Sequence, residues 1–181
     1  MKKIVVYMVG AIILFVWNAI SWMALPFHND SLKTIPEAAI DFQGMQAQLQ
    51  EDGIYHYPSF DTESMSEKLA SGPRIPFLVY IDGPTEIFDP AVFAKSFIMN
   101  LVSSILLFTL LAKMSDTSRS NIIAMSLVAG LLIGFVSDLP QMNWYMFPLS
   151  YTLINVFDHI IGFSLMGIFF SFFRLKAQKE T

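Results

Sequence analysis

The chain has no cysteine among its 181 residues. This absence excludes disulfide bonds, thiolate metal sites, cysteine nucleophiles and thiol redox chemistry. Charged residues make up only 14% of the chain, and no G-x-S-x-G, H-E-x-x-H, P-loop or dinucleotide-binding motif occurs. With three histidines in all, the sequence offers few ligands for a metal centre. It therefore favours a protein that is not an enzyme, and we predict no cofactor.

Hydrophobic residues are abundant in this chain. They account for 54% of the sequence, including 17 Phe and 11 Met, which is typical of an integral membrane protein. Four apolar runs are each close to the roughly 20 residues that cross a bilayer core. The runs cover residues 4–25, 91–112, 121–139 and 149–173. We predict an all-α integral membrane fold, a four-span antiparallel helical bundle with a small α/β extracytoplasmic insert between spans 1 and 2.

The predicted domains follow these spans. They are transmembrane helix 1 (1–27), an extracytoplasmic cap (28–89), transmembrane helices 2 (90–112), 3 (119–139) and 4 (148–174), and a cytoplasmic tail (175–181). Asp89 and Pro90 have the N-cap and N1 types that begin a helix. Pro140 and Pro148 are expected to bracket a short turn that holds an aromatic belt at headgroup level.

The cap reads as helix, strand, helix, strand. Thr34 and Glu37 have capping-box spacing, and apolar residues then recur at helical intervals as far as Leu49, which predicts one amphipathic helix ending at Gly53. Two β-rich runs, 54–57 and 75–81, flank a short helix predicted over residues 62–71. So small a unit buries little apolar area, and we expect it to rest on the bundle or on another subunit.

The distribution of lysine and arginine predicts how the chain is oriented in the membrane. All lysines and arginines of the termini and of the 113–119 loop fall on one side of a four-span chain, and residues 141–147 have none. By the positive-inside rule both termini are cytoplasmic, in a bacterial-type inner (plasma) membrane. The outer segment from Asp30 to Asp89 carries eleven acidic residues against three basic ones, so we expect no nucleic-acid partner.

Polar residues at a similar depth form the first candidate site. At 1.5 Å per residue, Asn18, Asn100 and Asp158 each lie roughly 11 to 15 Å from the outer boundary, and His159 follows Asp158. An ionisable residue inside a span is costly and needs partners, which makes it a candidate functional group. This midplane cluster fits a proton relay or a cation site. A closed hydrogen-bond network that only fixes the bundle remains the alternative.

Two further groups of residues have separate interpretations. Ser126, Gly130 and Gly134 step by four along span 3, and Gly162 lies in span 4; small residues of this kind favour close helix packing. At the outer mouth, His28, Asp30 and Asp138 offer polar side chains that, with His56, would form a metal site or remain solvated. We leave the metal question open.

The sequence supports three functions. The leading one is a non-catalytic accessory, assembly or scaffolding component of a larger membrane complex, with the lipid bilayer and other membrane subunits or a second copy as partners. A small transporter or proton- or cation-coupled channel that uses Asp158 and His159 comes second. A membrane metal- or cofactor-binding protein with ligands at the outer mouth comes third. The run Ser-Trp-Met-Ala-Leu-Pro-Phe-His-Asn-Asp that ends at Asp30 resembles a motif, to which we attach no family.

Overall fold

The protein is mostly helical and divides into two compact units. The computed structural model describes residues 3–59, 64–86 and 88–173. One unit, here the helical unit, comprises residues 1–33, 88–143 and 147–181; the other, the insert unit, comprises 34–87 with 144–146. The described residues include four helices long and apolar enough to cross a membrane, over 3–24, 90–112, 119–145 and 149–170. The predicted multi-pass character is therefore supported by length and composition.

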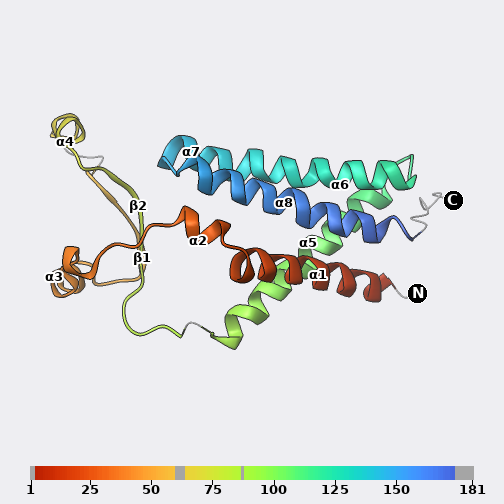
Figure 1. Ribbon diagram of the computed structural model, residues 1–181, viewed down its shortest axis with the longest axis horizontal. Coiled ribbons are helices and arrows are strands. Elements are labelled where there is room, and N and C mark those ends of the chain that lie inside the picture. The colour runs from red at the N-terminus through yellow and green to blue at the C-terminus, as the bar shows by residue number, and fades with distance from the viewer. Residues whose placement is uncertain (1–2, 60–63, 87, 174–181) are drawn as a thin grey trace. The chain divides into compact units, whose positions relative to one another are not determined.

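The four long helices alternate in direction within the helical unit (Figure 1). Their elements are α1 (Lys3–Ala19) with the π-helical turn η1 (Ile20–Ala24) and α2 (Phe27–Ser31), α5 (Pro90–Ala112), α6 (Arg119–Ile133) with the π-helical turn η3 (Gly134–Asp138) and α7 (Leu139–Tyr145), and α8 (Leu149–Phe170). α6 and α8 lie side by side, α1 packs against both α5 and α8, and α5 contacts α6 much less.

The start of α5 confirms the predicted helix boundary. The Asp89 carboxylate accepts a hydrogen bond of 2.7 Å from the Ala91 N–H, and Pro90 occupies the first turn. A proline costs nothing at that position because its missing N–H would have no partner there.

The predicted turn beginning at Pro140 is wrong, because the helix continues as α7 as far as Tyr145. The π-helical turn η3 precedes the proline, and the Leu139 N–H donates to the Gly134 carbonyl, five residues back. A π-helical turn changes the local hydrogen-bond register, which lets the chain accept a residue without an N–H at a smaller cost than a regular helix interior.

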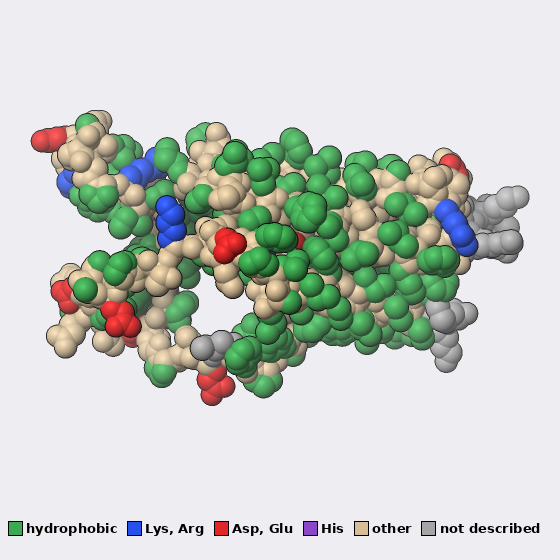
Figure 2. All heavy atoms as spheres, in the orientation of Figure 1, with side chains coloured by type: hydrophobic (Ala, Val, Ile, Leu, Met, Phe, Trp, Pro, Cys, Tyr) green, Lys and Arg blue, Asp and Glu red, His purple; other side chains and the backbone are tan. Residues whose placement is uncertain are grey.

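Apolar packing is concentrated at the end of the helical unit where α1 begins and α8 ends. The buried hydrophobic side chains of the core come from α1, the last turns of α5, the start of α6 and the last turns of α8. They are Val6, Leu14, Leu107, Phe108, Leu111, Ile122, Met166 and Phe170. Figure 2 shows that hydrophobic side chains also cover most of the visible face of this unit, as expected of a surface in contact with lipid.

Small residues let α6 and α8 approach closely. A Cβ at Gly130 would collide with the His159 backbone carbonyl, and one at Gly134 would lie 2.9 Å from the Val156 methyl groups. Ser126 faces Gly167 in the same way, and its hydroxyl donates to the Ile122 carbonyl of its own helix. Gly162 of α8 lies against α1 instead, where a Cβ would come within 2.6 Å of Leu14. All four residues predicted to pack thus lie at helix contacts.

The insert unit holds the two-stranded sheet, with β1 (Gly53–Tyr57) antiparallel to β2 (Ile75–Tyr80). Both strands agree with the predicted runs to within one residue. The helix predicted from Thr34 to Gly53 is wrong: a 3₁₀ turn (Glu37–Ala39) and an extended Ile40 precede α3 (Phe42–Gln48). Asp41 supplies the competing N-cap, since its carboxylate accepts a hydrogen bond from the Gly44 N–H at 2.9 Å.

The second predicted helix of the insert unit appears as α4 (Met65–Ser71). Its expected start at Thr62 lies outside the described residues, as does the tail 175–181. None of the residues of α3, β1, α4 and β2 is buried, so these elements have no apolar core of their own.

Candidate functional site

Three buried polar side chains, from η1, from α2 and from the middle of α8, meet in the helical unit. The Ser21 hydroxyl lies 2.7 and 2.8 Å from the two carboxylate oxygens of Asp158. The Nε2 atom of His28 lies 2.8 Å from Asp158 Oδ2 and 3.2 Å from the Ser21 hydroxyl. Ser21 and His28 are each 1% exposed and Asp158 is 7% exposed. A carboxylate this deeply buried is costly unless it is paired, and here it has two polar partners.

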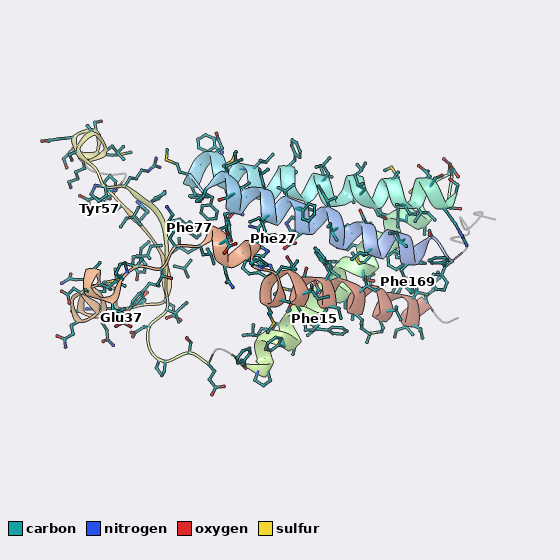
Figure 3. The ribbon with its side chains drawn as sticks, in the orientation of Figure 1. Phe15, Phe27, Glu37, Tyr57, Phe77 and Phe169 are labelled. Atoms are coloured by element: carbon teal, nitrogen blue, oxygen red, sulfur yellow. The ribbon has the colours of Figure 1, made fainter. Side chains whose placement is uncertain are left out.

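Two local features bring His28 to this position. The π-helical turn η1 carries Ser21 and Trp22, and the chain then turns at Pro26 into the short helix α2, which packs against α8. Phe27 marks α2 in Figure 3. The Trp22 ring stacks on the His28 ring, with centroids 3.7 Å apart and planes inclined by 16°. π-helical turns are frequent at functional sites, and this one holds two of the residues around Asp158.

The arrangement is not that of a serine hydrolase. In a catalytic triad one imidazole nitrogen takes the serine proton while the other is held by the carboxylate. Here a single nitrogen, His28 Nε2, contacts both groups, and the serine hydroxyl is held by the carboxylate itself. His28 Nδ1 is buried and has no hydrogen-bond partner in the described part of the chain. The cluster is suited to holding a charge or a proton rather than to activating a nucleophile.

A second pair involves the residue that follows Asp158. His159 Nε2 lies 3.1 Å from Asp138 Oδ2, with the His159 side chain 34% exposed and that of Asp138 14% exposed. Asp138 closes the π-helical turn η3. Neighbours in sequence therefore pair with different helices, because adjacent side chains on a helix point about 100° apart. Asp158 and His159 belong to two separate acid–imidazole pairs.

A cavity of about 570 Å³ lies beside these pairs, lined by α1, η1, α5, α6 and α8. All four residues of the predicted midplane cluster line it, and two of them are in contact: Asn18 Nδ2 lies 3.4 Å from Asn100 Oδ1. Asn100 is 6% exposed, and its Nδ2 has no hydrogen-bond partner among the described residues. The cavity occupies the half of the helical unit that the apolar core leaves unfilled.

Comparisons with known proteins give no match. No protein-family model matches this chain, and neither a curated protein nor a solved structure matches it. The chemistry of the cavity is accordingly derived from its own lining residues.

Polar and aromatic side chains share the cavity wall. No lysine or arginine is among the lining residues, and Asp158 and His159 are the ionisable ones. The remaining polar groups are the amides of Asn18, Asn100 and Asn155 and the hydroxyls of Ser96 and Ser103. Four aromatic residues also line the cavity, Phe15, Trp22, Phe93 and Phe163, together with Leu14, Ala19, Met23 and Ile133. Phe15, labelled on α1 in Figure 3, also packs edge-on against Phe97 of α5.

The residues proposed for the outer mouth do not converge. His28 pairs with Asp158, Asp138 pairs with His159, and Asp30 is exposed. His56 belongs to the insert unit, where its Nδ1 lies 3.0 Å from the Pro58 carbonyl. Across residues 3–59, 64–86 and 88–173, no group of three His, Cys, Asp or Glu side chains is placed to hold a metal ion.

We did not predict the contact between His28 and Asp158 from the sequence, because counting residues along the spans put the two at different depths. The signal that pointed to it was the run from Ser21 to Asp30, which contains Ser21, Trp22 and His28. Its spacing follows neither a helical nor a strand period, and such irregular runs mark positions set by tertiary contacts.

Proposed function

We propose that the protein binds a small polar solute in the cavity and couples this binding to protonation of the His28–Asp158 pair, as a small transporter or channel does. The supporting observation is the 2.8 Å contact between two almost fully buried ionisable groups, one of which lies on the cavity wall. Intramembrane pairs of this kind mark proton and ion pathways, because keeping them in a low-dielectric medium costs free energy.

The distribution of packing supports the same function. The helical unit is closed by apolar side chains at one end and holds a polar cavity toward the other. α5 forms one wall of the cavity through Phe93, Ser96, Asn100 and Ser103, and it packs mainly on α1. A wall helix with few contacts on its other side is the element that can move with the least loss of packing.

The stacked Trp22 ring provides a test of this function. In a variant with Trp17→Phe and Trp144→Phe, Trp22 is the remaining indole, and protonation of the imidazole stacked on it changes its emission. We expect a reversible step in emission when the pH is changed across the range in which imidazoles change charge. Adding Asp158→Asn removes the charge that faces the imidazole, so the step should move to lower pH.

Asp30→Asn serves as the control, since Asp30 lies on the same short helix but is exposed. It should leave the step in place. The proposed function is contradicted if the protein with an intact Asp158 shows no emission step, or if Asp158→Asn leaves the step at the same pH.

The orientation is part of the proposal. We propose a bacterial-type inner membrane with both chain termini in the cytoplasm and the insert unit outside, on the distribution of lysine and arginine. Ser59→Cys should react with a membrane-impermeant thiol reagent in whole cells, and Ser118→Cys should react only after lysis. Both positions are exposed and the chain has no other cysteine, so labelling reports the side directly. The reverse pattern refutes the orientation.

The insert unit favours a second candidate, the accessory or scaffolding component expected from the sequence. Ile54 and Val79 face each other across the sheet and are 65% and 57% exposed, in a unit whose helices and strands bury no residue. Exposed apolar surface of this kind is characteristic of a protein contact. Light scattering of native protein should then give a protein mass above the 20.5 kDa of one chain. A monomer without a reproducible partner argues against this role.

A further inference from the structure

We infer that the solute bound in the cavity is a small organic ammonium ion that also carries a hydroxyl or carbonyl oxygen. The inference rests on the proposed function and specifies its ligand. Four properties of the lining residues lead to it: the sign of the charge, the aromatic rings, one buried amide donor, and the exchange of positive charge at Asp158.

The sign of the charge comes first. Asp158 is one of the residues that line the cavity, and no lysine or arginine is among them, so an anion would find no fixed positive charge there other than a protonated histidine. A neutral solute would have no use for a buried carboxylate, whose presence is costly in an apolar medium. A monovalent cation repays that cost, because its charge compensates the carboxylate when it binds.

The aromatic rings favour an organic cation over a metal ion. Phe15, Trp22, Phe93 and Phe163 line the cavity, and the faces of aromatic rings attract ammonium groups; one face of Trp22 is already stacked on His28. Metal ions instead need several oxygen or nitrogen ligands in a fixed geometry. No suitable group of three acidic or histidine side chains occurs among the described residues.

The side chain of Asn100 is the reason for expecting an oxygen atom on the ligand. Its side chain is 6% exposed, lines the cavity, and has an Nδ2 group with no partner within the described part of the chain. A buried donor left unpaired costs about 1–3 kcal/mol. A ligand oxygen that accepts a hydrogen bond from Nδ2 recovers this cost, so a hydroxyl or carbonyl on the ammonium ion improves its binding.

The fourth property links binding to protons. Asp158 holds one positive charge at a time, either the His28 imidazolium at 2.8 Å or the ligand. When the ammonium ion binds the carboxylate, His28 gives up its proton to water, and the charge of the site is unchanged. Of the elements packed against this pair, η1 contributes no titratable group, Asp30 of α2 is exposed, and His159 of α8 pairs with Asp138 of η3 instead.

The test is calorimetry on the full-length protein in lipid nanodiscs, with choline and its uncharged isostere 3,3-dimethylbutan-1-ol. Below the pH of the Trp22 emission step, we expect saturable choline binding with release of one proton, measured from the heats in two buffers of different ionisation enthalpy. The isostere should bind at least about tenfold more weakly. Above that pH the proton release should disappear, because His28 is already neutral.

Asn100→Leu should weaken choline binding by about tenfold and leave the Trp22 step in place. Thr109→Val, on the same helix but outside the cavity lining, is the matched control and should change neither. Equal binding of the isostere and choline, or no choline binding at millimolar concentration, overturns the ammonium inference while a persisting Trp22 step leaves the proposed function intact. Loss of the step in the protein with an intact Asp158 defeats the proposed function itself.

Discussion

Asp158→Leu is expected to lower the melting temperature of the purified protein by roughly 10 °C, since each kcal/mol is worth about 2–4 °C in a chain of this size. The substitution leaves the buried Ser21 hydroxyl and the His28 ring without their acceptor. Breaking a buried pair by removing one partner costs about 3–5 kcal/mol, because the other partner stays in an apolar medium.

Asp158→Asn separates the structural role of the carboxylate from its charge. The amide oxygen still accepts from Ser21, and the amide nitrogen donates to a neutral His28, so we expect a stability loss of about 1 kcal/mol. Differential scanning fluorimetry measures both variants, and Asp30→Leu, at an exposed carboxylate, is the control. A proton-linked site predicts near-native stability with a displaced Trp22 step for Asn. Equal melting temperatures for Leu and the unsubstituted protein would falsify any role for the buried cluster.

The parts of the fold that the sequence predicted are those set by local chemistry. Asp89 and Pro90 begin α5 because a carboxylate cap and a residue without an N–H both suit a helix start. The strands β1 and β2 follow from β-branched and aromatic residues between turn residues. The long spans follow from hydrophobic length alone.

Local chemistry also explains the two wrong predictions, since each contained two competing signals. Thr34 and Glu37 have the spacing of a capping box, but the helix that forms is capped by Asp41, seven residues after Thr34. Pro140 normally marks a helix end, yet η3 lets the chain continue as α7. Sequence alone gives no free energy with which to rank such alternatives.

The four residues predicted for the midplane cluster line one cavity, but their side chains do not pair as expected. Counting residues along ideal helices put Asn18, Asn100, Asp158 and His159 at a similar depth, and all four line the cavity. The same count placed His28 beyond the span, because it has no means of showing that α2 folds back against α8. It also joined Asp158 with His159, which in the structure contact different helices. Pairing depends on side-chain direction and chain reversal, and both are tertiary properties.

A double-mutant cycle on His28 and Asp158 is expected to show the largest non-additivity in the protein. His28→Leu leaves a buried carboxylate that is paired with the Ser21 hydroxyl alone among the described side chains, so it should destabilise by about 3–5 kcal/mol, like Asp158→Leu. With both residues replaced by leucine, no ionisable group remains in the cluster. The double variant should therefore be more stable than the sum of the single losses predicts, by about 2 kcal/mol or more.

The pair of Asp138 and His159 provides a control cycle that shares the helix α8 with the buried pair. His159 Nε2 lies 3.1 Å from Asp138 Oδ2, and the His159 side chain is 34% exposed, against 1% for that of His28. Partial solvation weakens the attraction and lowers the cost of leaving either residue alone, so the coupling should be well below that of the buried pair. Additive losses at His28 and Asp158 mean that the 2.8 Å contact contributes nothing. Strong coupling at His28 and Asp158, together with a Trp22 step that is displaced in Asp158→Asn, means that one contact supports both the fold and the proton-linked site.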